Sequence, residues 1–208
     1  MFNLKQVCEK HGVVPRGVIH IGAHEGQEVA EYKVLNVQKI VFIEANPTVY
    51  ERLVGTISGT PHVMAVNCAI SDVNGTVTLH VTSMDQSSSI LPLKQVSVIY
   101  PLIKETHAIV VPSRTIDSLL TELKLMPADY NILNIDIQGA ELLAFKGGTN
   151  LLTHLDAIFT EVNFEELYEG CPLIGQLDEF LGNYGFCRVE VTTPYHPSWG
   201  DAMYVRIS

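Results

Sequence analysis

The sequence has few positive charges and lacks a long apolar run. Its 208 residues include 13 Lys and Arg against 23 Asp and Glu, which gives a formal net charge of −10. A chain with this charge repels polyanions at long range, so binding to nucleic acid is not expected. No apolar stretch approaches the roughly 20 residues that span a bilayer, and residues 1–12 lack the apolar core of a signal peptide. We therefore expect a cytoplasmic protein with no integral membrane segment.

Cysteine is also scarce, and its spacing excludes two kinds of framework. The four cysteines, Cys8, Cys68, Cys171 and Cys187, form no C-x-x-C pair. This spacing indicates reduced, mostly buried thiols rather than a disulfide framework or a zinc site. Clustered carboxylates could hold a divalent metal such as Mg²⁺, but the sequence does not favour one, and we assign no metal ligands.

What the chain does have is enough apolar material for a sizeable core. Hydrophobic residues make up 47% of the sequence and charged residues 17%, and no repeat or linker divides the chain. We expect one domain over residues 1–208. Short β-branched runs alternate with helical segments, which indicates βαβ units and a parallel sheet covered on both faces. The strands that we expect in this part of the fold are 17–21, 39–43, 62–66, 131–135 and 157–162, and a helix over 26–36 is expected between the first two.

Two further pairs of strands have a different pattern. Residues 76–82 and 106–112 are expected to be antiparallel additions that flank the polar loop SMDQSSS. Residues 186–192 and 201–207 are expected to form an antiparallel hairpin that closes the chain. The predicted fold class is therefore α/β and Rossmann-like, with a mostly parallel sheet and an antiparallel edge. In such sheets ligands bind beyond the carboxyl ends of the strands.

The turn after the first strand favours a nucleotide-type ligand. Gly22 opens this turn, and Glu44 follows the second strand 22 positions later, where a carboxylate can accept hydrogen bonds from ribose hydroxyls. A dinucleotide fingerprint needs glycine at the first, third and sixth turn positions, but His24 and Gln27 occupy the last two. S-adenosylmethionine has no phosphate, and His24 and Gln27 could bond its carboxylate and amine. An ordinary βα turn with a polar helix start remains the alternative.

Two carboxylates are expected at the rim where a cofactor and an acceptor would meet. Asp136 ends the apolar run NILNI, and Glu161 lies near the end of the next strand, FTEVNF. A buried carboxylate at the end of a strand must be paired or used. Asp136 is our leading candidate for a catalytic base and Glu161 the second. Asp136 could instead hold the amino group of the cofactor or a metal.

The sequence resembles the FkbM family of S-adenosylmethionine-dependent methyltransferases. The resemblance is carried by IHIGAHEGQE (19–28), VFIEANP (41–47), NCAISDVNGTVTLHV (67–81), QSSSI (86–90), RTIDSLL (114–120), LNIDIQGAELLAFKGG (133–148), FTEVNF (159–164) and GDAMYVR (200–206). It implies a class I methyltransferase fold with a seven-stranded sheet, and O-methylation, commonly of a sugar hydroxyl or a polyketide. Gln138 departs from the pattern, because the family usually has Glu there.

The resemblance completes the set of candidate site residues. Ala69, Ile70 and Ser71 would approach the adenine, although a turn bonded to its own backbone explains Ser71 equally well. The cofactor-binding candidates are Gly22, Ala23, His24, Gly26, Gln27, Glu44, Ala45, Ala69, Ile70, Ser71 and Asp136. The substrate-binding candidates are Ser88, Ser89, Asn163, Tyr195 and Trp199. Tyr195 and Trp199 could stack against a sugar or could simply stabilise a Pro-rich turn.

The expected function is therefore methylation of a hydroxyl with S-adenosylmethionine as the cofactor. The expected acceptor is a small molecule or glycan, with a sugar hydroxyl favoured. Two alternatives stay open. One is a nucleotide-dependent oxidoreductase on a similar sheet, and the other is a non-catalytic module that retains a cofactor pocket.

Overall fold

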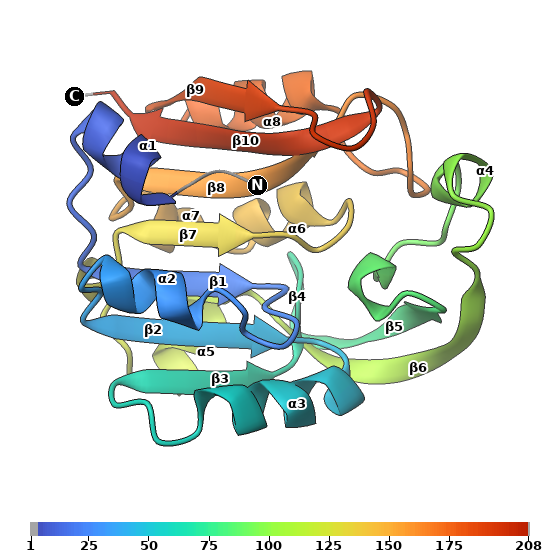
Figure 1. The fold of residues 1–208 in the computed structure, drawn as a ribbon, viewed down its shortest axis with the longest axis horizontal. Helices are drawn as coiled ribbons and strands as arrows, with labels where there is room; N and C mark the ends of the chain where they lie inside the picture. The colour runs from blue at the N-terminus through green and yellow to red at the C-terminus, as the bar shows by residue number, and fades with distance from the viewer. Residues whose placement is uncertain (1–3, 208) are drawn as a thin grey trace.

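The computed structural model describes residues 4–207 and has a seven-stranded sheet at its centre (Figure 1). The strand order is β3-β2-β1-β7-β8-β10-β9, and β10 alone runs antiparallel to the other six. The strands are β1 (Gly17–Ile21), β2 (Lys39–Glu44), β3 (Val63–Asn67), β7 (Ile132–Ile135), β8 (Ala157–Asn163), β9 (Phe186–Thr192) and β10 (Trp199–Arg206).

Helices cover both faces of this sheet, which explains why its central strands are apolar throughout. Every residue of β1 and of β8 is buried, as expected for parallel strands that have a helical layer on each side. One face packs against α1 (Leu4–His11), α2 (Val29–Val34) and α3 (Pro47–Ile57). The other face packs against α5 (Ile116–Glu122), α6 (Glu141–Lys146), α7 (Thr149–Leu152) and α8 (Ile174–Gly182).

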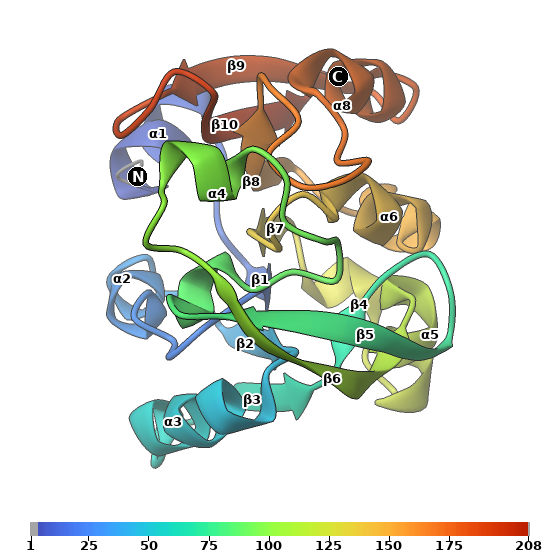
Figure 2. The same cartoon turned by 90° about the vertical axis from the view of Figure 1, so that its right-hand side faces the viewer.

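A second, smaller sheet lies beyond the carboxyl ends of the main strands. It contains β4 (Ala69–Ile70), β5 (Gly75–Thr82) and β6 (Glu105–Arg114) in the order β4-β6-β5. Between β5 and β6 the chain forms a short 3-10 helix, η1 (Asp85–Ser87), and α4 (Val96–Ile99). Figure 2 looks onto this edge and shows the segment from β5 to β6 crossing it. A second 3-10 turn, η2 (Pro127–Asp129), precedes β7.

The predicted fold class is confirmed, including the mostly parallel sheet and the antiparallel C-terminal pair. The expected pair at 76–82 and 106–112 is antiparallel as well. One boundary differs, because the helix expected over 26–36 begins only at Val29. His24 and Gly26 both have positive φ, so the segment before Val29 is a turn and cannot be helical. Between residues 4 and 207, no helix has the length and apolar character needed to cross a membrane.

Candidate functional site

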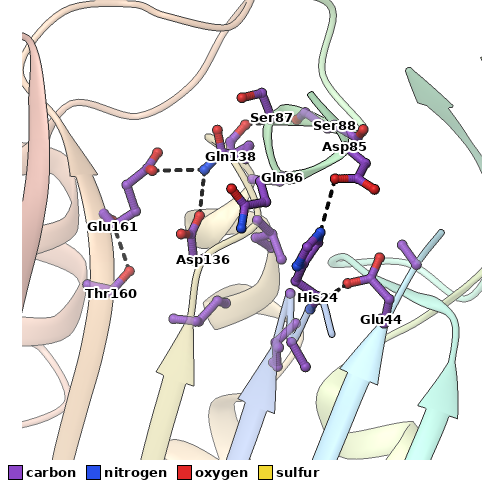
Figure 3. Close-up of a pocket in the computed structure, with 18 of the residues that line it drawn as sticks. His24, Glu44, Asp85, Gln86, Ser87, Ser88, Asp136, Gln138, Thr160 and Glu161 are labelled. Atoms are coloured by element: carbon purple, nitrogen blue, oxygen red, sulfur yellow. Dashed lines mark hydrogen bonds and ion pairs between the residues drawn. The ribbon is translucent and has the colours of Figure 1, made fainter. Parts of the chain in front are cut away.

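The carboxyl ends of β1, β2, β7 and β8 border a cavity of about 930 Å³. This edge also contains the turn after β1 and the loop after β7, and the segment from β5 to β6 forms its roof (Figure 3). A cavity of this volume fits a cofactor-sized ligand. The cavity therefore lies where an open α/β sheet normally binds its ligand.

The turn after β1 is tied to the end of β2 by backbone hydrogen bonds. The amides of Gly22 and Ala23 donate to the Ile43 carbonyl at 2.9 and 3.1 Å. The His24 amide donates to Oε2 of Glu44 at 2.9 Å, while the Asn46 amide donates to its Oε1 at 2.8 Å. Burial raises the pKa of Glu44, and these two amides partly offset the shift. Glu44 thus holds the turn in place and lines the cavity at the same time.

Gly22 is required by the close approach of two loops. Its φ is +76°, and a Cβ at this position would lie 1.8 Å from the backbone oxygen of Asp136. Glycine is the residue that tolerates both the left-handed backbone and the absence of space. The turn after β1 and the loop after β7 are therefore packed directly against each other.

His24 connects this turn to the roof of the cavity. Its Nε2 lies 3.0 Å from Oδ1 of Asp85, and its Nδ1 lies 2.9 Å from Nε2 of Gln27. Arg52 forms ion pairs with Asp85 and with Glu25. Partial burial alone would raise the pKa of Asp85, but the hydrogen bonds from His24 and Arg52 outweigh it and lower this pKa. Asp85 therefore stays ionised and fixes the roof of the cavity to the turn after β1.

Asp136 and Glu161 lie on the same rim and share one hydrogen-bond donor (Figure 3). Nε2 of Gln138 donates to Oδ1 of Asp136 at 2.6 Å and to Oε2 of Glu161 at 2.8 Å. The Tyr168 hydroxyl donates to Oε1 of Gln138 at 2.6 Å, which orients the amide. Gln138 itself has a φ of +57°, and such strain in a non-glycine residue is typical of a functional loop.

The two rim carboxylates differ in their surroundings. Asp136 borders the open cavity, and loss of hydration, together with the charges of Asp201 and Glu28, raises its pKa to about 6. Glu161 is 4% exposed. Burial, followed by the charges of Asp136 and Glu141, raises the pKa of Glu161 well above its usual value. Asp136 is therefore the member of the pair that is open to a ligand in the cavity.

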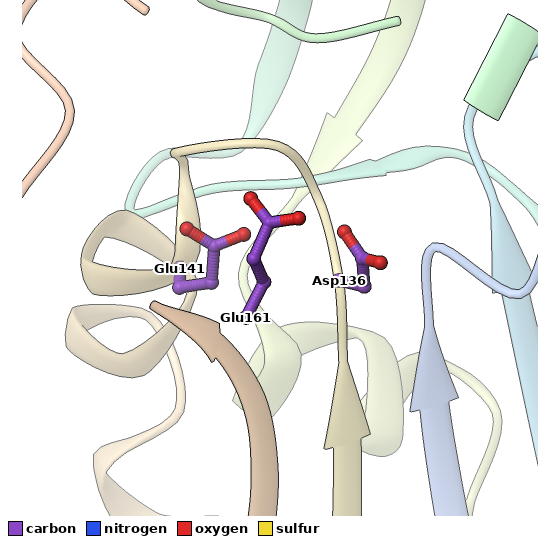
Figure 4. Close-up of side chains that lie close together, drawn as sticks. All are labelled: Asp136, Glu141 and Glu161. Atoms are coloured by element: carbon purple, nitrogen blue, oxygen red, sulfur yellow. The ribbon is translucent and has the colours of Figure 1, made fainter. Parts of the chain in front are cut away.

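Glu141 joins this pair in a cluster of three carboxylates (Figure 4). One oxygen from each of Asp136, Glu141 and Glu161 lies within 4.8 Å of the others. Oε1 of Glu141 accepts from the amides of Ile137 and Gly139 at 3.0 and 3.2 Å, whereas its buried Oε2 has no partner. Carboxylates are ligands for Mg²⁺ and Ca²⁺, but the Gln138 amide already donates protons to two of these three groups.

The serine loop, residues 87–89, is hydrogen-bonded to the loop after β7 that contains Asp136. Oγ of Ser89 donates to the Gln138 carbonyl at 2.8 Å and accepts from the Leu91 amide at 3.0 Å. Oγ of Ser88 accepts from the Thr82 amide at 3.2 Å. The loop is therefore an ordered part of the cavity wall and not a flexible linker.

Aromatic side chains form another part of the wall. The rings of Tyr195 and Trp199 stack with centroids 5.6 Å apart and an interplanar angle of 24°. Nε1 of Trp199 donates to the Tyr100 hydroxyl at 3.1 Å. All three residues line the cavity, and the Tyr195 side chain remains 73% exposed. The stacked rings therefore add a flat apolar surface to the cavity.

The charged side chains of the cavity have one sign. Among the described residues, seven carboxylates line it and no Lys or Arg does. They are Glu28, Glu31, Glu44, Asp85, Asp136, Glu161 and Asp201. The two histidines that line it are His20 and His24, and burial lowers the pKa of His20 to about 3, so its ring is neutral. The cavity is therefore suited to a cationic ligand and unfavourable to a phosphate.

Most of the residues that the sequence identifies come together in this one cavity. Those that line it are Gly22, Ala23, His24, Gln27, Glu44, Ala45, Ala69, Ile70, Ser88, Ser89, Asp136, Glu161, Tyr195 and Trp199. Three candidates, Gly26, Ser71 and Asn163, do not line it. Gly26 lies against α3. The Ser71 hydroxyl donates to Asp72 and its amide donates to the Arg114 carbonyl, while Asn163 is 1% exposed at the end of β8.

The structure also adds residues that the sequence did not identify. Glu28 and Asp85 line the cavity, as do Tyr100 and the apolar residues of the roof around α4. For Glu28, the sequence did offer a signal, because an acidic residue stands just before the helix. No local signal marks Asp85, because its partner His24 lies 61 positions away in the sequence.

Comparisons with known proteins show what this chain is similar to. The 2-O-methyltransferase NoeI of Sinorhizobium fredii is 29% identical over 170 residues, which cover 77% of this chain and 69% of that protein. Magnesium protoporphyrin IX methyltransferase from Synechocystis, solved with S-adenosylmethionine bound, superposes with a TM-score of 0.53 at 8% identity, over 98% of this chain and 78% of that one. A candidate RNA methyltransferase from Pyrococcus horikoshii gives a TM-score of 0.52 at 9% identity, over 98% and 80% of the two chains.

The two solved structures are too distant in sequence to show more than a common fold. The family model gives the more specific result. The methyltransferase FkbM domain model matches residues 20–187, which include the turn after β1, the serine loop and the acidic rim. The chain therefore belongs to the FkbM methyltransferase family.

Proposed function

We propose that the chain is an S-adenosylmethionine-dependent O-methyltransferase whose acceptor is a sugar hydroxyl. The observation that carries the proposal is the charge of the cavity in a member of a methyltransferase family: seven carboxylates and, in the described part of the chain, no Lys or Arg. The sulfonium and the ammonium of S-adenosylmethionine are cations. The pyrophosphate of a dinucleotide is an anion, so the same carboxylates disfavour an oxidoreductase.

The residues around the cavity divide into parts that suit the cofactor. Glu44 would hold the ribose hydroxyls, and the turn Gly22–Gln27 would hold the methionine end. The small, buried side chain of Ala69 and the apolar side chain of Ile70 would lie against the adenine. When bound, S-adenosylmethionine supplies a methyl group that its sulfonium has already activated.

Asp136 is the proposed base for the hydroxyl proton of the acceptor. A base works best when its pKa lies near the working pH, and the pKa of Asp136 is raised to about 6. Above that pH the carboxylate is ionised and can accept a proton. Glu161 is buried and its pKa is raised further, so we give it the second role of holding Gln138, and with it Asp136, in position.

The acceptor is assigned from the aromatic side chains that line the same cavity as Asp136. The stacked pair Tyr195 and Trp199 offers a flat apolar face with polar groups close by, a combination that suits a sugar ring. The relative NoeI is named as a 2-O-methyltransferase, which supports a hydroxyl as the methylated group. Ser88 and Ser89 lie in the same cavity and are proposed to bind the acceptor.

Calorimetry and a transfer assay test the proposal together. We expect S-adenosylhomocysteine to bind and NAD and NADP not to bind. Tritiated S-adenosylmethionine should then label a free sugar or glycoside in a panel that also contains phenols, carboxylates and a short RNA. Binding of NAD with no binding of S-adenosylhomocysteine would overturn the cofactor. Cofactor binding with no transfer to any member of the panel would favour a non-catalytic module.

A further inference from the structure

Glu28 is an acidic residue of the cavity for which neither the fold nor the proposed chemistry has yet supplied a role. It precedes α2, lines the cavity, and its side chain is 15% exposed. Its Oε2 is buried and has no hydrogen-bond partner. A buried carboxylate oxygen without a hydrogen-bond partner costs free energy. We therefore expect a ligand of the working protein to donate a hydrogen bond to this oxygen.

The neighbouring His20 cannot complete it. Its Nδ1 lies 3.9 Å from Oε2 of Glu28, beyond hydrogen-bond distance. Nδ2 of Asn134 donates to the Tyr32 hydroxyl at 2.8 Å, and this hydroxyl lies 3.1 Å from Nδ1 of His20. Since Tyr32 accepts from Asn134, its own proton goes to Nδ1 of His20. That nitrogen is therefore an acceptor with no proton for Glu28.

His24 and the Glu28 amide offset only part of the rise that burial causes in the pKa of Glu28. In the described chain no Lys or Arg lines the cavity, and Glu31 and Asp136 are among the carboxylates that do. Burial, followed by the charge of Glu31, raises the pKa of Glu28. The charge of Glu28 in turn helps to raise the pKa of Asp136. A cation at this place would relieve both effects.

We propose that the carboxylate of Glu28 binds the α-ammonium group of the cofactor's methionine part, an assignment that rests on the proposed function. An ammonium has three protons to donate, whereas a sulfonium has none, so a hydrogen-bonding carboxylate selects the ammonium. Asn134 lines the same part of the cavity, and because its Nδ2 is used by Tyr32, its remaining polar atom is an acceptor. The Glu28 carboxylate and Oδ1 of Asn134 therefore both offer acceptors to an ammonium in this part of the cavity.

The test compares ligands that have and lack the amino group. In calorimetry, Glu28→Gln should weaken S-adenosylhomocysteine binding by about 10- to 150-fold, the range for a hydrogen bond to a charged group. Binding of 5′-methylthioadenosine, which has no amino-acid part, should change by less than about twofold. The matched control is Glu51→Gln, because Glu51 is an exposed carboxylate of α3 that does not line the cavity. It should change both affinities by less than about threefold.

A second comparison needs no variant and stays informative if Glu28→Gln fails to fold. Wild-type protein should bind the desamino analogue of S-adenosylhomocysteine about 10- to 150-fold more weakly than the parent. Equal affinity for these two ligands, or an equal loss in Glu28→Gln and Glu51→Gln, would overturn the inference and leave the proposed function intact. Wild-type protein that binds none of the adenosine ligands would instead overturn the proposed function.

Discussion

The backbone amide of His24 donates a 2.9 Å hydrogen bond to Oε2 of Glu44, so a carboxylate from one strand holds the turn that follows the adjacent strand. Glu44→Ala should therefore weaken both cofactor binding and the stability of the fold. Binding of S-adenosylhomocysteine should weaken by about 10- to 150-fold, and the free energy of unfolding should fall by about 1–3 kcal/mol because two amides lose their acceptor. Calorimetry and urea unfolding measure the two effects. The exposed residue Glu51 provides the control, and Glu51→Ala should change neither quantity.

Gly22 should tolerate no side chain. Gly22→Ala would place a Cβ 1.8 Å from the Asp136 backbone oxygen at a φ of +76°. Gly59 has a similar φ of +72°, but no atom lies within 4 Å of its added Cβ. Gly59→Ala should therefore cost only the left-handed backbone, about 1–2 kcal/mol, and Gly22→Ala clearly more. Thermal unfolding compares them, and equal losses would mean that the two loops are not packed as described.

Asp136 should control the rate far more than the affinity. Asp136→Asn keeps the size of the side chain and removes the base, so we expect kcat to fall by about 10²- to 10⁴-fold with S-adenosylhomocysteine affinity within about threefold. Glu161→Gln should have a smaller effect. In the wild type, kcat/KM for the cofactor should rise with pH through about 6 and then level off, because the base of the free enzyme must be deprotonated. Full activity in both variants would remove the acidic rim from the chemistry.

Glu141 should make the fold less stable as the pH rises. Burial raises its pKa to about 7, above the value of about 4.3 for an unfolded chain. The folded state therefore binds a proton more tightly, and stability is lost as the pH rises through about 7. Glu141→Gln keeps an acceptor for the two loop amides and removes the titration. Between pH 5 and pH 8 it should gain about 1–3 kcal/mol relative to wild type in urea unfolding. A constant difference would contradict this.

Chelation should leave the activity unchanged. Although three carboxylates meet at the rim, the Gln138 amide directs its protons toward two of them, and these protons would repel a cation. We expect EDTA to change kcat by less than about twofold. Loss of activity with EDTA that added Mg²⁺ restores would show that this amide rotates away for a metal.

The sequence was sufficient for residues whose position follows from the end of a strand. Glu44 and Asp136 each follow an apolar run, and a parallel sheet brings all such ends to one edge. Asn163 was placed on the same argument, but β8 extends to Asn163, which pairs with Trp199 of β10 and is buried. Alternation along a strand does not show how far its neighbour continues, so this limit could not be read from the sequence.

The sequence pattern could not predict the positions of residues that are placed by the conformation of a loop. Glu28 faces the cavity because the turn before it contains two residues of positive φ, His24 and Gly26, and periodicity had placed the start of the helix in that turn. Ser71 is drawn into the small sheet by a hydrogen bond from its amide to the Arg114 carbonyl. Such contacts are set by packing between distant segments, which local propensity does not encode.

The roof of the cavity is one continuous stretch of chain whose two ends are neighbours, since Gly75 pairs with Ser113 across β5 and β6. Glu44 and Asp136 and the turn Gly22–Gln27 all lie outside this stretch. The segment can therefore be exchanged between members of the family with a single pair of junctions. On the proposed function, such a graft would replace Ser88 and Ser89, the proposed acceptor-binding residues of this segment, and would keep Tyr195 and Trp199. A graft that also replaces Asp85 would need a new partner for His24.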